Sequence, residues 1–163
     1  MGSSCQLYGL RSAGRWGIGD FSDLGRLARA AGSRKAAVLG INPLHALFAA
    51  EPLHISPYSP SSRSWLNYLY IDVTVVPGFA EDETVRALIG SEWFAATRHG
   101  AHSSEIIDYA AVAACKRPVL EALFRRFQIH ELGGDGATRG DSRSGIPRVS
   151  TRWGTSARRL CRV

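Results

Sequence analysis

The sequence predicts an α/β fold that contains at least one strand–helix–strand unit. A short apolar run from Gln6 to Leu10 is followed by a segment with helical spacing and then by a second apolar run, Ala36 to Ile41. This order is typical of two parallel strands joined by a crossover helix. The second run holds only small or apolar residues, which predicts a strand covered on both faces.

The helix between these runs has start and stop signals. Asp20 stands where an N-cap belongs, Asp23 falls in the first turn, where it favours the helix dipole, and Gly32 is expected to end the helix. Apolar side chains recur at helical spacing at Phe21, Leu24, Leu27, Ala28 and Ala31.

The glycine-rich turn before this helix, GRWGIGD, raises the question of phosphate binding. Its spacing, G-x-x-G-x-G, differs from the dinucleotide fingerprint, and no Gly-Lys-Ser/Thr follows. We therefore expect its glycines to allow a tight turn around Trp16 and not to hold a phosphate.

A long loop, Ile41 to Asp72, follows the second predicted strand. A loop of this length inside a compact domain is either functional or disordered. It contains four prolines and the aromatic residues Phe48, Tyr58, Trp65, Tyr68 and Tyr70. Disordered segments are poor in aromatic residues, so we expect an ordered loop. A stiff loop of aromatic and small polar residues suits a flat ligand with many hydroxyl groups, and a sugar is the leading candidate.

The chain after this loop is predicted to be mostly helical. Val73 to Val76 form a short β-prone piece, and a helix is expected over roughly 84–98. The acidic run 81–83 precedes this helix and is expected to favour its N-terminus, not to act as a catalytic pair. A second helical pattern covers 108–127, where Pro118 predicts either two helices or one kinked helix.

Composition is that of a single soluble globular domain: 163 residues, 45% hydrophobic and 21% charged. No apolar run approaches the roughly 18 residues that span a membrane, and the N-terminus lacks a secretory signal pattern. Cys5, Cys115 and Cys161 are widely spaced and are expected to be free thiols in a reducing compartment. We therefore expect a cytoplasmic protein with no membrane partner.

Metal and nucleic-acid binding are both disfavoured. His99 and His102 lie three apart, and His45 and His54 lie in the long loop, but no set of three or four converging ligands is evident, so we expect no metal and no cofactor. The net charge of +6 comes mostly from 128–163, which has few aromatic residues. A nucleic-acid-binding module is the least favoured alternative, and it predicts salt-sensitive binding that is lost when 128–163 are deleted.

Three segments resemble one enzyme family. They are QLYGLRSAGRWGIGDFSDL (Gln6 to Leu24), GINPLHALFAAEPLHISPYSPSSRSWLNYLYID (Gly40 to Asp72) and DYAAVAACKRPVLEALF (Asp108 to Phe124). They resemble the 4-alpha-glucanotransferases, or amylomaltases, and most of all the bacterial, maltodextrin-using form. The resemblance covers roughly residues 6–127, and the unusual run SPYSPSSRSWLN argues against chance similarity.

The resemblance implies a (β/α)8 barrel, of which this chain would supply only the first βα units. In that fold, catalysis takes place on loops at the C-terminal ends of the strands. The implied reaction is the retaining transfer of an α-1,4-glucan segment to glucose or another glucan, with an α-1,4-glucan or maltooligosaccharide as substrate. Such chemistry needs two carboxyl groups about 5 Å apart. Nothing in the chain matches the motifs that carry them, so no catalytic residue is assigned and the chain is expected to be inactive.

The resemblance also implies substrate-binding residues in the long loop. Tyr58, in Ser56-Pro57-Tyr58, resembles the tyrosine that lies against the glucosyl ring next to the cleaved bond. Ser56, in the same motif, is also assigned to substrate binding. Asn67 and Asp72 are the other two candidates, and each either hydrogen-bonds sugar hydroxyls or holds the loop through nearby backbone groups. Tyr68 departs from the family, where a proline or small apolar residue is common, and this departure puts the local rigidity of Asn67 in doubt.

We expect two regions along the chain. Residues 1–127 form the N-terminal part of the barrel, and 128–163 form an irregular tail that is disordered or translated out of frame. The tail loses the resemblance, the periodicity and the apolar content together. Translating the downstream DNA in the other two frames tests the frameshift hypothesis, which requires amylomaltase-like sequence in one of them. A non-catalytic carbohydrate-binding fragment is the main alternative for the whole chain.

Overall fold

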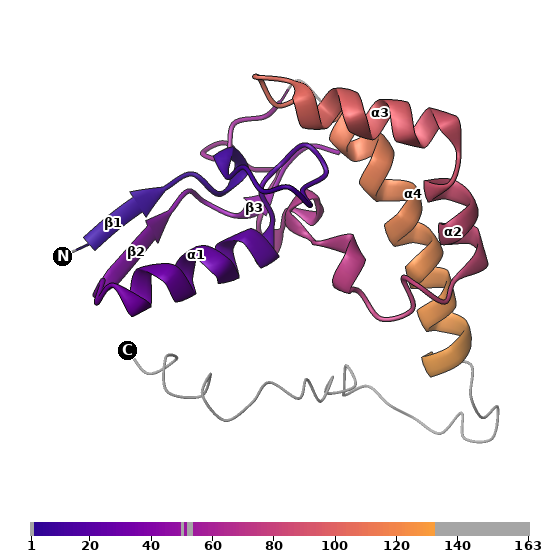
Figure 1. The fold of residues 1–163 in the computed structure, drawn as a ribbon, viewed down its shortest axis with the longest axis horizontal. Helices are drawn as coiled ribbons and strands as arrows, with labels where there is room; N and C mark the ends of the chain where they lie inside the picture. Colours follow the sequence, from indigo (N-terminus) through magenta and orange to yellow (C-terminus); the bar gives the residue numbers. More distant parts are fainter. Residues whose placement is uncertain (1, 50, 52–53, 133–163) are drawn as a thin grey trace.

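The computed structural model describes residues 2–49, 51 and 54–132, the last two of these by their backbone only. A two-stranded parallel sheet and α1 form one half of the molecule, and α2, α3 and α4 form the other (Figure 1). The helices and strands are β1 Gly2–Cys5, α1 Phe21–Ser33, β2 Val38–Ile41, β3 His45–Ala46, β4 Ser62–Leu66, α2 Glu83–Ile89, α3 Glu92–Ser103 and α4 Tyr109–Phe127. The predicted α/β class is confirmed.

The strand–helix–strand unit is present, but its first strand lies earlier than predicted. β1 and β2 pair in parallel, from Gly2 opposite Val38 to Cys5 opposite Ile41. The apolar run assigned to a strand instead forms a 3-10 turn over Leu7–Gly9. The backbone N–H of Leu7 donates to Asn42 Oδ1 at 2.7 Å, and its side chain is fully buried. The run therefore packs into the core and does not join the ladder.

The start of α1 matches the sequence signals, whereas its end and the following strand do not. Asp20 and Asp23 form a reciprocal capping box. The helix continues through Ser33, so Gly32 lies inside its last turn, and Lys35 adopts the left-handed conformation that turns the chain. Val38 is 64% exposed. The expected coverage of β2 on both faces is therefore wrong, because none of its four residues is buried against the described part of the chain.

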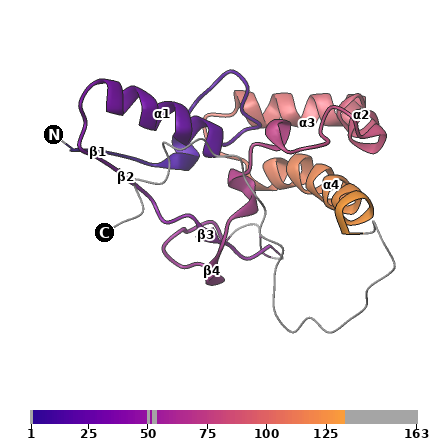
Figure 2. The same ribbon diagram turned by 90° about the horizontal axis from the view of Figure 1, so that it is seen from below.

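The long loop contains a small antiparallel hairpin that the sequence did not predict. β3 and β4 pair with an irregularity between His45 and Ala46 (Figure 2). Ser61 closes the base of the loop, since its backbone N–H donates to Ala46 O at 2.9 Å and its hydroxyl lies 2.9 Å from Leu47 O. The chain therefore leaves β3 and returns to β4 at a base that these two hydrogen bonds close.

The predicted helix over 84–98 is two helices, α2 and α3, which meet at Gly90 and Ser91. The Ser91 hydroxyl accepts the Phe94 N–H and starts the second helix. The acidic run has the capping role expected of it, because the Asp82 side chain accepts the Val85 N–H. The β-prone piece after Asp72 is a 3-10 turn, Val73–Val75, and not a strand.

α4 runs without interruption through Pro118, so of the two predicted alternatives the structure has the single helix and not two helices. The chain remains helical over Gln128–Leu132, beyond the predicted end of the barrel region. The rest of the predicted tail, from residue 133 onward, lies outside the described residues, and the domain boundary stays a prediction. None of the described helices has the length and apolar character to cross a bilayer.

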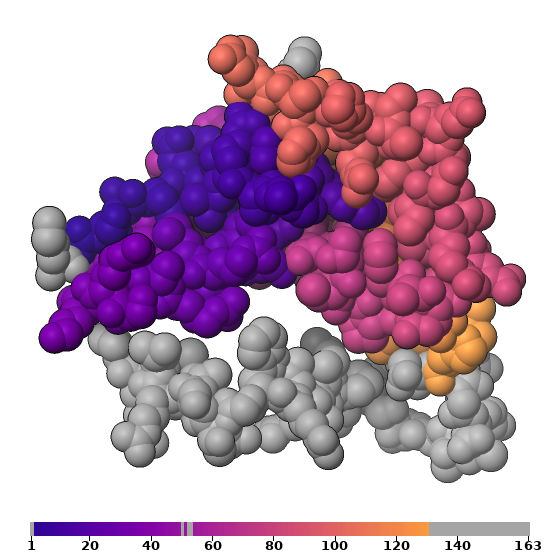
Figure 3. All heavy atoms as spheres, viewed as in Figure 1, coloured from indigo at the N-terminus to yellow at the C-terminus, as the bar shows by residue number. Residues whose placement is uncertain are grey.

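The core consists of two clusters that meet at the glycine turn. One joins Trp16 to α2, α3 and α4, and the other joins Leu7 and Ile18 to α3, α4 and the Tyr68–Tyr70 turn. Gly17, between Trp16 and Ile18, has φ of +81°. In the space-filling view the N-terminal residues pack directly against α3 (Figure 3). The turn therefore connects the sheet half of the molecule to the helical half.

Candidate functional site

Tyr58 stands at the corner of a tight turn. The Ser59 N–H donates to Ser56 O at 3.2 Å, which makes Ser56–Ser59 a β-turn with Pro57 at its second position. Proline fixes its own φ near the value this position requires. The corner projects Tyr58 outward, and its side chain is 68% exposed. The SPYS motif thus presents an aromatic ring on a pre-ordered turn.

A cleft of about 540 Å³ lies beside this turn. Three segments form it: the 3-10 turn near the N-terminus, the loop tip, and the connection between α3 and α4. The lining residues are Tyr8, Gly9, Arg11, Ile55, Ser56, Pro57, Tyr58, Glu105, Ile106, Ile107 and Tyr109. Two of the predicted site residues, Ser56 and Tyr58, therefore line one concave surface together.

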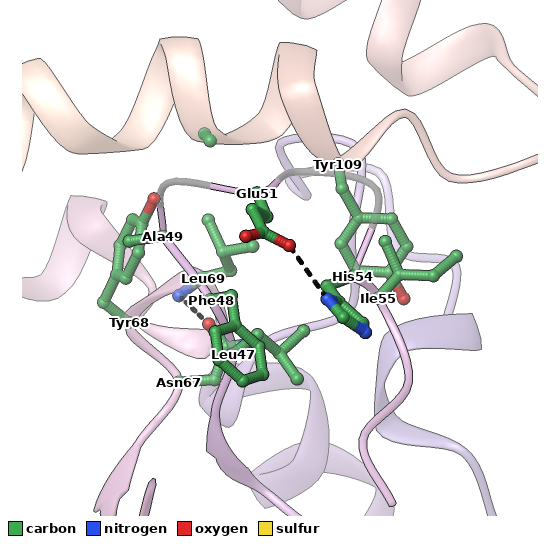
Figure 4. A pocket seen from close by; sticks show the side chains of 11 residues that line it. Leu47, Phe48, Ala49, Glu51, His54, Ile55, Asn67, Tyr68, Leu69 and Tyr109 are labelled. Carbon is green, nitrogen blue, oxygen red and sulfur yellow. Dashed lines mark hydrogen bonds and ion pairs between the residues drawn. The ribbon is translucent and has the colours of Figure 1, made fainter. Parts of the chain in front are cut away.

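A narrow pocket of about 40 Å³ adjoins the cleft and shares Ile55 and Tyr109 with it. Its wall is a stretch of loop in which Glu51 and His54 lie 3.1 Å apart and Phe48 packs on the His54 ring (Figure 4). The His54 N–H also donates to Glu51 O. These contacts hold Phe48, Glu51 and His54 together just before the Tyr58 turn.

The other two predicted site residues lie outside the cleft. Asn67 is 2% exposed at the narrow pocket, and its Oδ1 accepts the Leu69 N–H at 3.0 Å. Asp72 accepts from both the backbone N–H and the hydroxyl of Thr74. Burial acts to raise the pKa of Asp72, but hydrogen bonds from Ser22 and Thr74 outweigh it and leave the pKa below its usual value. Both side chains hold local backbone.

Several cleft residues were not identified from the sequence. Tyr8, Arg11, Glu105 and Tyr109 come from segments remote from the loop. Burial, with further contributions from Tyr70 and Tyr8, raises the pKa of Tyr109 to about 12, so its hydroxyl keeps its proton. Arg11 donates to Ser104 O and Glu105 O and so ties the first turn to the α3–α4 connection.

A buried lysine holds the segment behind the loop. Lys116 on α4 is 1% exposed, and its Nζ donates to Leu69 O and Ile71 O, both at 2.7 Å. Burial lowers the pKa of Lys116 to about 8, although the nearby Asp20 and Asp72 oppose that shift. This side chain fixes the turn between Asn67 and Asp72 to the helical half.

The cleft contains one carboxyl group, that of Glu105. Asp20 and Asp23 do lie together, but each is 5% exposed and each caps α1, so neither is accessible to a substrate in the cleft. Burial raises the pKa of Asp20. Within residues 2–49, 51 and 54–132, no group of three or more His, Cys, Asp or Glu side chains is arranged to hold a metal ion.

Comparisons with known proteins identify the family. Residues 5–139 match the family model for 4-alpha-glucanotransferase. The 4-alpha-glucanotransferase of Haemophilus influenzae is 42% identical over 127 residues, which is 78% of this chain and 18% of that protein. The 4-alpha-glucanotransferase of Mycobacterium tuberculosis is 41% identical over 83 residues, or 47% of this chain and 12% of that protein.

A solved structure agrees with these relatives. The crystal structure of amylomaltase from Corynebacterium glutamicum superposes with a TM-score of 0.62 and 30% sequence identity, covering 90% of this chain and 24% of that one. The chain therefore spans less than a quarter of the length of each of these relatives. Since the family model spans most of the sequence, the chain belongs to the 4-alpha-glucanotransferase family.

Proposed function

We propose that this chain supplies the N-terminal, glucan-contacting part of the catalytic (β/α)8 barrel of a 4-alpha-glucanotransferase. The observation that carries the proposal is the cleft that the exposed ring of Tyr58, on its tight turn, lines together with Tyr8 and Tyr109. Aromatic rings remove the apolar faces of a sugar from water, while their hydroxyls reach its polar rim. An α-1,4-glucan or maltooligosaccharide is the proposed ligand.

The position of the cleft in the fold supports the barrel part of the proposal. β1 and β2 are parallel and are joined by α1, as consecutive barrel strands are. The chain enters the loop directly after β2 ends at Ile41. Ligand-binding loops of such barrels also follow the C-terminal ends of strands.

The proposed reaction of the complete domain is retaining transfer of a glucan segment, which needs two carboxyl groups about 5 Å apart. Glu105 is the sole carboxylate lining the described cleft. We therefore expect the remaining barrel to provide the catalytic acids and this chain alone to bind without catalysing. Binding without catalysis is also what the alternative of a carbohydrate-binding fragment requires.

Incubation of the 163-residue chain with maltotriose is expected to release no glucose above a protein-free blank, because the cleft lacks a carboxylate pair. Coupled-enzyme detection of glucose over many hours measures this. A complete family member assayed in parallel is the positive control. Glucose release that scales with the amount of purified chain would contradict the assignment of the catalytic acids to other segments.

Replacing Tyr58 by alanine is expected to weaken maltoheptaose binding about tenfold, since the sugar loses its aromatic surface. Isothermal titration of the wild-type chain, Tyr58→Ala and Tyr58→Phe with maltoheptaose separates the ring from the hydroxyl. Trp93→Ala is the matched control, because Trp93 is an exposed aromatic residue on α3 that does not line the cleft. Equal affinities for wild type and Tyr58→Ala would remove Tyr58 from the site.

A further inference from the structure

A second, strongly basic pocket lies on the face formed by the glycine turn and α3. It has a volume of about 240 Å³ and is lined by Ala13, Arg15, Ala95, Arg98, His99 and His102. It shares no lining residue with the Tyr58 cleft. No carboxylate lines it, and neither Arg15 nor Arg98 has a carboxylate oxygen within 4 Å in the part of the chain that the structure describes.

Arg15 lines this pocket and is anchored to two backbone carbonyls. Its guanidinium donates to Ser12 O at 2.9 Å and to His102 O at 2.8 Å, and its Nε is buried without a partner among the described residues. Burial, followed by the neighbouring charge of Arg11, lowers the pKa of Arg15, with Asp23 opposing.

The other basic side chains come from one face of α3. Arg98 and His102 are four residues apart, and Ala95 precedes Arg98 by three, so all three lie on the same side of the helix. The short side chain of Ala95 leaves space beside the cations. His102 Nδ1 lies 3.3 Å from Arg15 O. A carbonyl oxygen only accepts, so Nδ1 donates and the ring orientation is fixed by the same turn.

We propose that Arg15, Arg98, His99 and His102 form a binding site for a small phosphate group, either inorganic phosphate or a phosphate monoester. Guanidinium groups match the oxygen geometry of phosphate and remain charged at all relevant pH values. The pocket is smaller than the roughly 300–1,000 Å³ of sites for drug-sized ligands, which favours a compact anion. This function lies outside the glucan transfer proposed for the cleft and does not depend on it.

The glycine turn contributes to this site through Arg15 and not through a helix N-terminus. At α1 the first turn is already capped by the carboxylates of Asp20 and Asp23, which would repel an anion. The sequence motif GRWGIGD therefore does not cradle a phosphate with its backbone. Its arginine instead points to the opposite element, α3, where two further basic residues of the pocket are exposed.

Titration of the full chain with inorganic phosphate at low ionic strength, about 20 mM NaCl, tests the proposal by calorimetry. Two charge-assisted contacts predict saturable binding with a Kd on the order of 1 mM. Arg98→Gln is expected to weaken this binding about tenfold. Arg98 is exposed and on the helix surface, so the variant is expected to fold as the wild type does, which circular dichroism checks.

A parallel titration with glucose 1-phosphate distinguishes a free phosphate from a phosphate monoester as the ligand, because tighter binding of the ester means that its organic part contacts the pocket.

Arg117→Gln is the matched control, since Arg117 is an exposed helical arginine on α4 that pairs with Glu121 at 3.0 Å. It is expected to bind phosphate as the wild type does. Three results would overturn the site: no saturable heat, an unchanged Kd in Arg98→Gln, or an equal loss in Arg117→Gln. The last would mean that phosphate associates with the general positive charge of the chain.

Discussion

Gly17→Ala is expected to lower the free energy of unfolding of the chain by about 3 kcal/mol. A Cβ at this position would lie 2.7 Å from Ala101 Cβ and 2.8 Å from Val112 Cγ2, so two helices would have to shift. Overpacking of this kind costs about 1–3 kcal/mol. The backbone φ of +81° adds about 1 kcal/mol for any residue with a Cβ.

The matched control for this substitution lies in the same turn. Gly14 has no atom within 4 Å of the position where a Cβ would be placed. Gly14→Ala is therefore expected to change stability by less than about 0.5 kcal/mol. Urea denaturation followed by tryptophan fluorescence, to which the buried Trp16 beside Gly17 contributes, measures both variants. Similar midpoints for the two alanine variants would mean that the turn does not join the two halves as the packing indicates.

The features that sequence predicted correctly are those set by neighbouring residues. Asp20 and Asp23 form the capping box that their spacing indicates, because both hydrogen bonds close within one turn. The parallel arrangement of β1 and β2 followed from strand–helix–strand order. The apolar run after β1 was misplaced, since burial of Leu7 against the core and its bond to Asn42 depend on a residue 35 positions away.

The predicted helix boundaries were also wrong where hydrogen bonds and packing in the fold decide them. The helix predicted over 84–98 crosses Gly90 and Ser91, where α2 ends at its Gly90 C-cap and α3 begins with the Ser91 hydroxyl accepting the Phe94 N–H. Pro118 lies inside a continuous helix although local rules favour a break. The helix packs on both core clusters through Val112 and Val119, and this tertiary packing offsets the local cost.

The candidate cleft was only partly accessible from sequence. Ser56 and Tyr58 are adjacent in one motif, and a single resemblance identified both. Tyr109 and Glu105 reach the cleft from the α3–α4 connection, far along the chain, so no local pattern relates them to the loop. For Asn67 and Asp72 the sequence left two roles open, sugar binding or holding the loop, and in the fold both accept from nearby backbone N–H groups. Residue type and position in the loop do not determine the direction of a side chain.

Lys116 lies among the buried residues Cys115 and Val119 on an apolar face of α4, where a lysine needs buried hydrogen-bond acceptors. Lys116→Met is expected to cost about 2 kcal/mol near neutral pH. Methionine retains the apolar stem, but two buried carbonyls, Leu69 O and Ile71 O, lose their donor. The loss of the buried charge offsets part of that cost. Urea denaturation compares the variant with wild type and with Arg117→Met, an exposed neighbour expected to change stability by less than about 0.5 kcal/mol.

The pH dependence of this difference separates the buried ammonium from simple packing. The pKa of Lys116 falls from 10.5 to about 8 on folding. Between about pH 8 and pH 10.5, the Lys116 amine is therefore protonated in the unfolded chain and mostly neutral in the folded chain. Stability from this group therefore rises with pH over that interval and is lost again as pH falls through the folded pKa. The cost of Lys116→Met should grow from about 2 to about 4 kcal/mol between neutral pH and about pH 10. Groups common to both proteins cancel in the difference. A cost that stays constant with pH would show that the Lys116 ammonium is as well solvated in the fold as in the unfolded chain.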